Sequence, residues 1–151
     1  IQNKFKKVNL TKITQQSIAQ VSHTALDRQI DVSLNADKNI SLNGIGTLFE
    51  ILAINLLKNA FACTPKGGKV LVLLASDSEW VTMSVSDSGI GIPKELHSRI
   101  FDRFYRAPGN KAIGTGLGLS IVKRIVEIHS AEVVVNDSEY GGAMITIKFP
   151  V

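Results

Sequence analysis

Apolar residues in the first part of this chain recur at a helical period. Over residues 11–28 they recur near helical spacing, and Asn9 or Thr11 is placed to cap the helix. The segment Leu42 to Ala62 is rich in apolar residues and free of proline, so it predicts a second, longer helix. Leu119 to His129 predicts a third. The apolar positions of the first helix are Ile13, Ile18, Val21 and Ala25.

Other segments alternate apolar and polar residues, which is the period of a β-strand. Turn-forming residues separate them, as Ser76-Asp77-Ser78 does between two of the strands. Strands joined by turns, with helices set between them, predict an α+β fold, a two-layer sandwich in which helices cover one face of a mixed sheet. The predicted strands are Ile30 to Leu34, Lys69 to Ala75, Trp80 to Val85, Ala131 to Asn136 and Ala143 to Phe149.

Composition places the chain with soluble globular proteins of one domain. It has 151 residues, of which 44% are hydrophobic and 20% charged. No apolar run approaches the roughly 20 residues that a membrane helix needs, and no signal peptide opens the chain. The single cysteine, Cys63, excludes an internal disulfide and suits a reducing cytosol. Because the sequence starts at Ile1 without a methionine, we expect it to be a fragment of a longer protein.

The net charge of +4 comes from scattered basic residues, with only Lys4, Lys6 and Lys7 clustered. We interpret this cluster as a solvated face and expect no nucleic-acid partner.

Two asparagines interrupt the long apolar helix. Asn55 and Asn59 are four residues apart, so they lie on one helical face. Buried amides cost free energy unless they are paired. Their side-chain oxygens suit a hard cation such as Mg²⁺, whereas the simpler alternative is hydrogen bonding to neighbouring backbone. The pair alone leaves both interpretations open.

The segment Asp87-Ser88-Gly89-Ile90-Gly91-Ile92-Pro93 follows a predicted strand directly. Glycines two residues apart let the chain turn sharply and let a ligand approach the backbone. A carboxylate at the strand end can accept a hydrogen bond from an exocyclic amine such as that of adenine. An ordinary Asp-Gly loop is the alternative, and no helix follows at the spacing that a Rossmann fingerprint requires.

A third segment, Gly114-Thr115-Gly116-Leu117-Gly118-Leu119-Ser120, leads into the last predicted helix. A glycine-rich turn at a helix N-terminus offers free N–H groups and the positive end of the helix dipole. The segment therefore favours a phosphate-binding site over the alternative, in which the three glycines serve packing alone.

The order of these segments resembles a known family. The asparagine helix, the Asp-Ser-Gly-Ile-Gly loop, the segment 100–106 (Ile-Phe-Asp-Arg-Phe-Tyr-Arg) and the run 114–127 resemble the N, first-glycine, phenylalanine and second-glycine boxes of bacterial sensor histidine kinases. The resemblance covers roughly residues 40–150. It implies the Bergerat-type ATP-binding sandwich shared with gyrase, MutL-type repair proteins and heat-shock chaperone ATPases.

The resemblance also implies roles for particular residues. Asn59 would be the principal Mg²⁺ ligand with Asn55 as its partner, Asp87 would bind the adenine amine, and residues 94–113 would form a mobile lid over ATP. Within that lid, Arg103, Arg106 or Lys111 would be placed to meet phosphates. The nucleotide-binding residues implied in this way are Asn55, Lys58, Asn59, Asp87, Gly89, Gly91, Ile92, Arg103, Phe104, Arg106, Lys111, Gly114, Thr115, Gly116, Leu117, Gly118 and Leu119.

The sequence departs from the family pattern at three places. Where relatives usually carry a basic residue and an aromatic after the second asparagine, this chain has Ala62 and Cys63, which predicts weaker nucleotide binding. The His-Gly-Gly usual after the last helix is His129-Ser130-Ala131 here. We expect His129 to be structural, because an imidazolium is favoured at a helix C-terminus.

Asn55 separates kinase from hydrolase chemistry. Gyrase-type relatives have a glutamate base at this position, and an amide cannot act as a general base at neutral pH. Glu50 lies nine residues before Asn59 and does not replace it. The chain is therefore expected to hand the γ-phosphoryl group to a protein acceptor rather than to water.

The acceptor is expected on a separate helical hairpin. Acceptor histidines of the family are followed by an acidic residue and soon afterwards by a proline. None of the three histidines of this chain, His23, His97 and His129, has that context. The implied partners are the protein's own dimerisation and phosphoacceptor domain, with residues 1–9 as a possible tail of its hairpin, and a downstream response regulator. The full-length protein is expected to be a homodimer in the inner membrane, with this domain in the cytoplasm.

Three rival functions remain open from sequence. The first is a serine kinase of the same superfamily, which the segment Phe101 to Phe104 disfavours. The second is a regulatory module without ATP binding, which Ala62 and Cys63 favour. The third is a gyrase-like clamp, which Asn55 disfavours.

Overall fold

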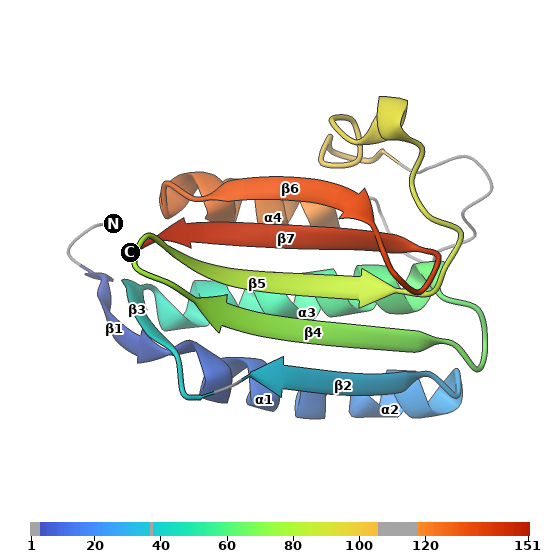
Figure 1. Cartoon of the computed structure of the whole chain (residues 1–151), viewed down its shortest axis with the longest axis horizontal. Coiled ribbons are helices and arrows are strands. Elements are labelled where there is room, and N and C mark those ends of the chain that lie inside the picture. Colours follow the sequence, from blue (N-terminus) through green and yellow to red (C-terminus); the bar gives the residue numbers. More distant parts are fainter. Residues whose placement is uncertain (1–3, 37, 106–117) are drawn as a thin grey trace.

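A computed structural model describes residues 4–36, 38–105 and 118–151. It has two layers, with a five-stranded sheet in front and the helices packed behind it (Figure 1). The predicted α+β sandwich, a mixed sheet with helices on one face, is confirmed. The strand order is β2-β4-β5-β7-β6, in which β2 and β4 are parallel and the other neighbours antiparallel. The strands are β2 (Asp31–Ala36), β4 (Lys69–Ser76), β5 (Trp80–Asp87), β6 (Glu132–Asp137) and β7 (Ala143–Pro150).

Alternation along the strands sends one set of side chains into the core. In β7, Ile145, Ile147 and Phe149 are buried, while the residues between them lie on the other face. All five strands predicted from alternation are found, each with ends within two residues of those expected.

The central helix α3 (Gly46–Cys63) supplies much of the core behind the sheet. By length and composition alone it is apolar enough to cross a membrane, although no run of that length was expected from the sequence. Its apolar side chains pack inside the domain instead, which is the usual reason that a core helix has this composition. Its buried residues are Phe49, Leu52, Ala53, Leu56, Leu57, Ala60 and Phe61.

The predicted first helix is two helices, α1 (Leu10–Gln20) and α2 (Ser22–Asp27), which meet at Val21. Of the two predicted caps, Asn9 is the N-cap, because its side chain accepts a hydrogen bond from Lys12 N at 3.0 Å. Thr11 instead ties the helix to a neighbouring loop, accepting from Ile40 N at 2.9 Å.

A small second sheet was missed by the sequence analysis. Strands β1 (Lys6–Asn9) and β3 (Ser41–Gly44) pair antiparallel, so the long helix begins at Gly46 rather than at Leu42. Residues 6–9, considered above as a possible hairpin tail, form β1. A short 3-10 helix, η2 (Lys94–Leu96), follows β5, and α4 (Gly118–Ile128) closely matches the predicted last helix.

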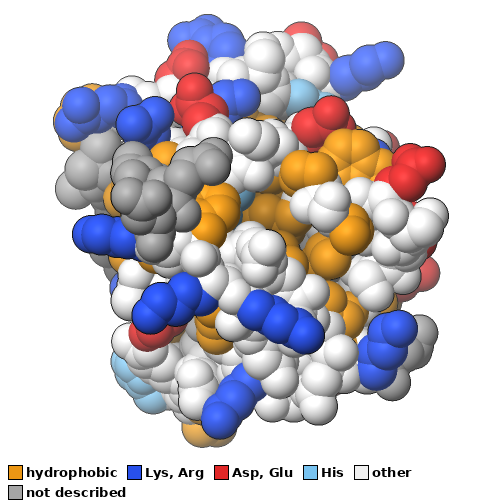
Figure 2. All heavy atoms as spheres, turned by 90° about the vertical axis from the view of Figure 1, so that its left-hand side faces the viewer, with side chains coloured by type: hydrophobic (Ala, Val, Ile, Leu, Met, Phe, Trp, Pro, Cys, Tyr) orange, Lys and Arg blue, Asp and Glu red, His pale blue; other side chains and the backbone are white. Residues whose placement is uncertain are grey.

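The molecule has two ends that differ in character. β1, β3 and the C-terminus lie at one end, and the far end collects the C-terminus of β5 and the N-terminus of β7 (Figure 1). On the first end hydrophobic side chains gather near the middle, with Lys and Arg side chains spread around them (Figure 2). The residues that carry candidate chemistry are concentrated toward the other end.

Candidate functional site

Helix α3 presents the two asparagines on one side. Asn55 and Asn59 are both half-buried. The Asn55 Nδ2 donates to the Ile51 carbonyl oxygen at 2.8 Å, one turn earlier. A Cβ added to Gly118 would lie 3.1 Å from Asn55 Oδ1, so this oxygen faces the first residue of α4. The amide nitrogen is thus held by backbone while the oxygen is directed toward the segment predicted to bind phosphate.

The side-chain oxygens of the two asparagines are candidate ligands for a cation at this place. Within the described ranges, no group of three His, Cys, Asp or Glu side chains is arranged to hold a metal ion. Asn55 offers a carbonyl oxygen whose orientation is fixed by its own amide group, which fits the oxygen preference of Mg²⁺.

Asp87 is the last residue of β5 and is only 5% exposed. Its Oδ1 accepts hydrogen bonds from Gly89 N at 2.9 Å and from Ala143 N at 3.2 Å. Burial raises the pKa of this carboxyl group above its ordinary value, although the two backbone donors act in the opposite direction. No described residue donates a hydrogen bond to Oδ2.

Gly89 brings the Asp87 loop onto the end of α3. A Cβ at this position would overlap the Cys63 carbonyl oxygen, so only glycine permits the contact. Gly91 is required for a different reason, since its φ of +77° is a conformation that L side chains rarely adopt. Both glycines singled out in this loop are therefore needed by its geometry.

The two ends of the candidate site are joined by α3. Asn55 faces Gly118, and Cys63, two turns later, contacts Gly89. Eight residues of α-helix correspond to about 12 Å. Asp87 and the N-terminus of α4 therefore lie near the two ends of this stretch of helix.

The remaining described candidates vary in their surroundings. Lys58 is exposed on α3, and Ile92 and Leu119 are half-buried against the core. The Arg103 guanidinium lies over the Phe104 ring, 5.3 Å from its centroid, and Phe104 is 63% exposed with a φ of +64°. The other candidates lie outside the described residues: Arg106, Lys111, Gly114, Thr115, Gly116 and Leu117.

His129 is structural, but the expectation that its ring is charged was wrong. Its Nδ1 bonds to the Ile125 carbonyl oxygen at 2.9 Å, and its Nε2 lies 3.2 Å from Ile45 N, which can only donate. Nδ1 therefore carries the proton in a neutral ring. Burial lowers the pKa of His129 and outweighs the raising effect of the hydrogen bond to the Ile125 carbonyl oxygen. The ring also stacks on Phe5 and packs against Phe49.

Two residues of the Asp87 site were missed by the sequence analysis. Ala143 donates its backbone N–H to Asp87, and a Cβ on Gly142 would overlap Oδ1 of the same carboxylate. These residues are more than 50 positions from Asp87, so no local pattern joins them. The doublet Gly141-Gly142 directly before the last strand was the available signal.

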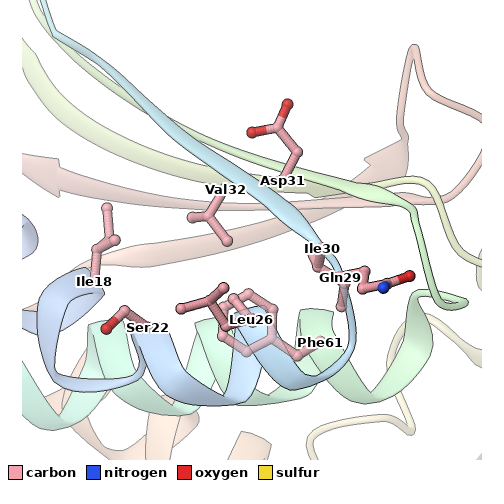
Figure 3. A pocket seen from close by; sticks show the side chains of 9 residues that line it. Ile18, Ser22, Leu26, Gln29, Ile30, Asp31, Val32 and Phe61 are labelled. Carbon is pink, nitrogen blue, oxygen red and sulfur yellow. The ribbon is translucent and has the colours of Figure 1, made fainter.

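The cleft shown in Figure 3 lies elsewhere. It has a volume of about 400 Å³ and is bordered by α1, α2, the start of β2 and Phe61 of α3. None of its lining residues is among the predicted nucleotide-binding positions. The lining side chains are Ile18, Ser22, Ala25, Leu26, Gln29, Ile30, Asp31, Val32 and Phe61.

Known proteins resemble this chain in sequence and in fold. The Escherichia coli (strain K12) sensor protein QseC is 39% identical over 137 residues, which are 90% of this chain and 30% of QseC. The structure of the mycobacterial sensor histidine kinase MprB has a TM-score of 0.85 and 28% identity, with 97% of both chains covered. Histidine kinase ThkA, solved in complex with response regulator protein TrrA, has a TM-score of 0.83 and 26% identity over 97% of this chain and 41% of that one.

The chain thus spans about a third of the length of its curated relative QseC. Residues 44–151 match the family described as histidine kinase-, DNA gyrase B-, and HSP90-like ATPase. Because this match covers most of the chain and the relatives are sensor histidine kinases, the chain belongs to this ATPase family as a domain of the sensor histidine kinase type.

Proposed function

We propose that residues 1–151 are the catalytic domain of a sensor histidine kinase, which binds Mg-ATP and donates the γ-phosphoryl group to a histidine on a separate helical domain. The single observation that carries this proposal is the Asp87 carboxylate. It is buried at the end of β5, and its Oδ1 is held by two backbone N–H groups. A buried carboxylate left with an oxygen to accept a further hydrogen bond suits the exocyclic amine of adenine.

Phosphate binding would take place at the other end of α3. The N-terminus of α4 offers N–H groups and a positive dipole end, and Gly118 allows the close approach of Asn55. Mg²⁺, when bound, would neutralise developing phosphate charge. Asn59 and Asn55 would hold it through their side-chain oxygens, as the fixed orientation of the Asn55 amide permits.

Transfer to a protein is favoured over hydrolysis. In the reaction the acceptor nitrogen forms a bond to the γ-phosphorus, the bond from that phosphorus to the bridging oxygen breaks, and ADP leaves. Water would need a base, yet Asn55 is an amide and Glu50 is exposed on α3. Positioning of the phosphates would therefore be the main contribution of this domain.

The partners follow from the same role. ThkA was solved with a response regulator, and by similarity we propose that a response regulator receives the phosphoryl group from this kinase. The phosphoacceptor histidine would lie on the protein's own dimerisation domain. We further propose that this domain is cytoplasmic in a homodimeric sensor of the inner membrane.

Calorimetry with a non-hydrolysable ATP analogue tests the proposal, with and without Mg²⁺. Binding that requires Mg²⁺ is expected, with an affinity reduced by the absence of a cation and an aromatic at Ala62 and Cys63. Absence of binding at millimolar analogue would favour the rival in which the domain is a regulatory module without nucleotide.

A further inference from the structure

Gly141 and Gly142, two adjacent glycines near Asp87, are needed for different reasons. Gly141 has a φ of +97°, and a Cβ there would meet no atom within 4 Å. Gly142 has no such positive φ, so its backbone conformation would accept an alanine. A Cβ on Gly142, however, would overlap Asp87 Oδ1. Gly141 is thus glycine for its conformation, and Gly142 for the space that it leaves.

The space beside Gly142 is where the carboxylate is held. A Cβ there would also lie 2.5 Å from Gly89 N and 2.6 Å from the Asp87 carbonyl oxygen. Gly89 N is one of the two donors to Oδ1, and the other is the N–H of Ala143, the residue directly after Gly142. A methyl group at position 142 would therefore collide with the carboxylate and with one of its two donors.

Holding Oδ1 determines what Oδ2 can do. Two N–H groups from different segments orient the plane of the carboxylate, and no described residue donates to Oδ2. A carboxylate free to rotate would present either oxygen, or neither, to a ligand. With Oδ1 engaged, Oδ2 is the oxygen left to accept a hydrogen bond from the base.

We propose that Gly142 is a positioning residue for adenine selection. Because it has no side chain, the N–H groups of Gly89 and Ala143 can both donate to Asp87 Oδ1, and Oδ2 is left to accept from the exocyclic amine. This inference rests on the proposed function, in which Asp87 recognises adenine. It predicts that the base preference of the domain depends on a residue that need not touch the base.

The test compares two non-hydrolysable nucleotides, the ATP analogue and its inosine counterpart, in which an oxygen replaces the exocyclic amine. Gly142→Ala should lose roughly tenfold to hundredfold in affinity for the ATP analogue, the range for one hydrogen bond to a charged group. Affinity for the inosine analogue should change little, so the preference for adenine should collapse. Calorimetry on the whole 151-residue chain measures both values.

Gly141→Ala is the matched control. It strains the same loop without placing an atom near the carboxylate, so it should lower stability and keep the adenine preference. Retention of the preference by Gly142→Ala, or an equal loss in Gly141→Ala, would overturn the positioning role.

A measurement on the unmutated protein covers the case in which Gly142→Ala does not fold. In NMR spectra recorded without nucleotide, the amide protons of Gly89 and Ala143 should shift together, with one midpoint, as the Asp87 carboxyl group titrates. Failure of either amide to follow that titration would show that Gly89 and Ala143 do not both donate to Oδ1 in solution, and it would overturn the proposal. Wild-type protein that binds neither nucleotide would contradict the proposed function itself, and wild type that binds both equally would contradict adenine recognition by Asp87.

Discussion

Asp87, the proposed adenine ligand, shows at the residue scale how a buried ionisable group can oppose folding. Its carboxyl group is buried, and its pKa is raised above 3.8 by that burial. A group whose folded-state pKa is raised contributes stability below its unfolded pKa, and this stability is lost as the pH rises through the folded value. At neutral pH the ionised Asp87 is therefore unfavourable for the nucleotide-free fold.

Asp87→Asn should separate the two effects. An asparagine oxygen can still accept from Gly89 N and Ala143 N, but its Nδ2 would place donors where the adenine amine also donates. We expect thermal unfolding at pH 7 at the same or a higher temperature than wild type, with ATP-analogue binding severely weakened. A lower melting temperature together with wild-type affinity would contradict both parts of the prediction.

His129 predicts a pH dependence of stability with the opposite sign. Because burial lowers its pKa below 6.5, the unfolded chain takes up a proton before the folded chain does. The stabilisation is fully present above pH 6.5 and is lost as the pH falls through the lowered value. Denaturant titrations of His129→Phe should lack this component. His23→Gln, at an exposed position on α2, should keep it, and equal pH dependence in wild type and His129→Phe would disprove the linkage.

Asn59 carries the metal prediction. Asn59→Ala removes a side-chain oxygen from a half-buried position on α3 where alanine is a good helix former, so the fold should be retained. Affinity for the Mg²⁺ complex of the ATP analogue should fall sharply, while affinity measured in excess chelator should change little. Wild-type affinity in the presence of Mg²⁺ would show that the metal is held elsewhere.

The residues of the site differ in how far sequence could identify them. Asn55, Asn59 and Asp87 belong to short sequence motifs, so their candidate chemistry can be inferred from a few neighbouring residues. Gly142 directly precedes β7 and lies against Asp87 at the end of β5, and the role proposed for it depends on the absence of a side chain in a crowded place. The charge state of His129 was misjudged because burial cannot be judged from its position at a helix end.

At the scale of elements, periodicity predicted long segments and failed on short ones. The five strands of the main sheet and α4 alternate or repeat over enough residues to be recognised. The four-residue strands β1 and β3 are too short for that, and the apolar Leu42 of β3 was assigned to the following helix. The break between α1 and α2 at Val21 contains neither Gly nor Pro, so no breaker marks it.

The connection from β5 to α4 carries the lid prediction. Residues 94–113 form a long connection for a compact domain, and of these residues 94–105 are described, with η2 as their only regular element. We expect fast amide hydrogen exchange over this segment without nucleotide, and slower exchange on adding Mg²⁺ and the ATP analogue. Fast exchange in both states would rule out a closing lid.

At the scale of the whole molecule, the decisive assay concerns transfer. The chain alone, incubated with γ-labelled ATP, should hydrolyse it very slowly and take up no label, because Asn55 offers no base and none of its histidines has the acceptor context. Adding the phosphoacceptor hairpin of the same protein should produce label on that hairpin.

The chemistry of the label identifies the class of kinase. Phosphohistidine is labile to acid and stable to base, whereas phosphoserine survives acid. Acid-stable label on the chain alone would favour the serine-kinase rival. As a control, Asp87→Asn should abolish transfer to the hairpin without changing the hairpin itself.

One consequence of the aromatic contacts around His129 concerns chain connectivity. Phe5 and Phe149 both lie against the His129 ring, at centroid distances of 5.0 and 6.1 Å, so the first described residues and strand β7 are neighbours at the end opposite Asp87. A short glycine-serine linker could therefore join residue 151 to residue 4, and new termini could be opened at the exposed β4–β5 turn around Ser78. Such a circular permutant should leave the end that carries Asp87 unaltered, and its new termini would lie beside the former C-terminus, because Val151 N donates to the Glu79 carbonyl oxygen at 2.9 Å.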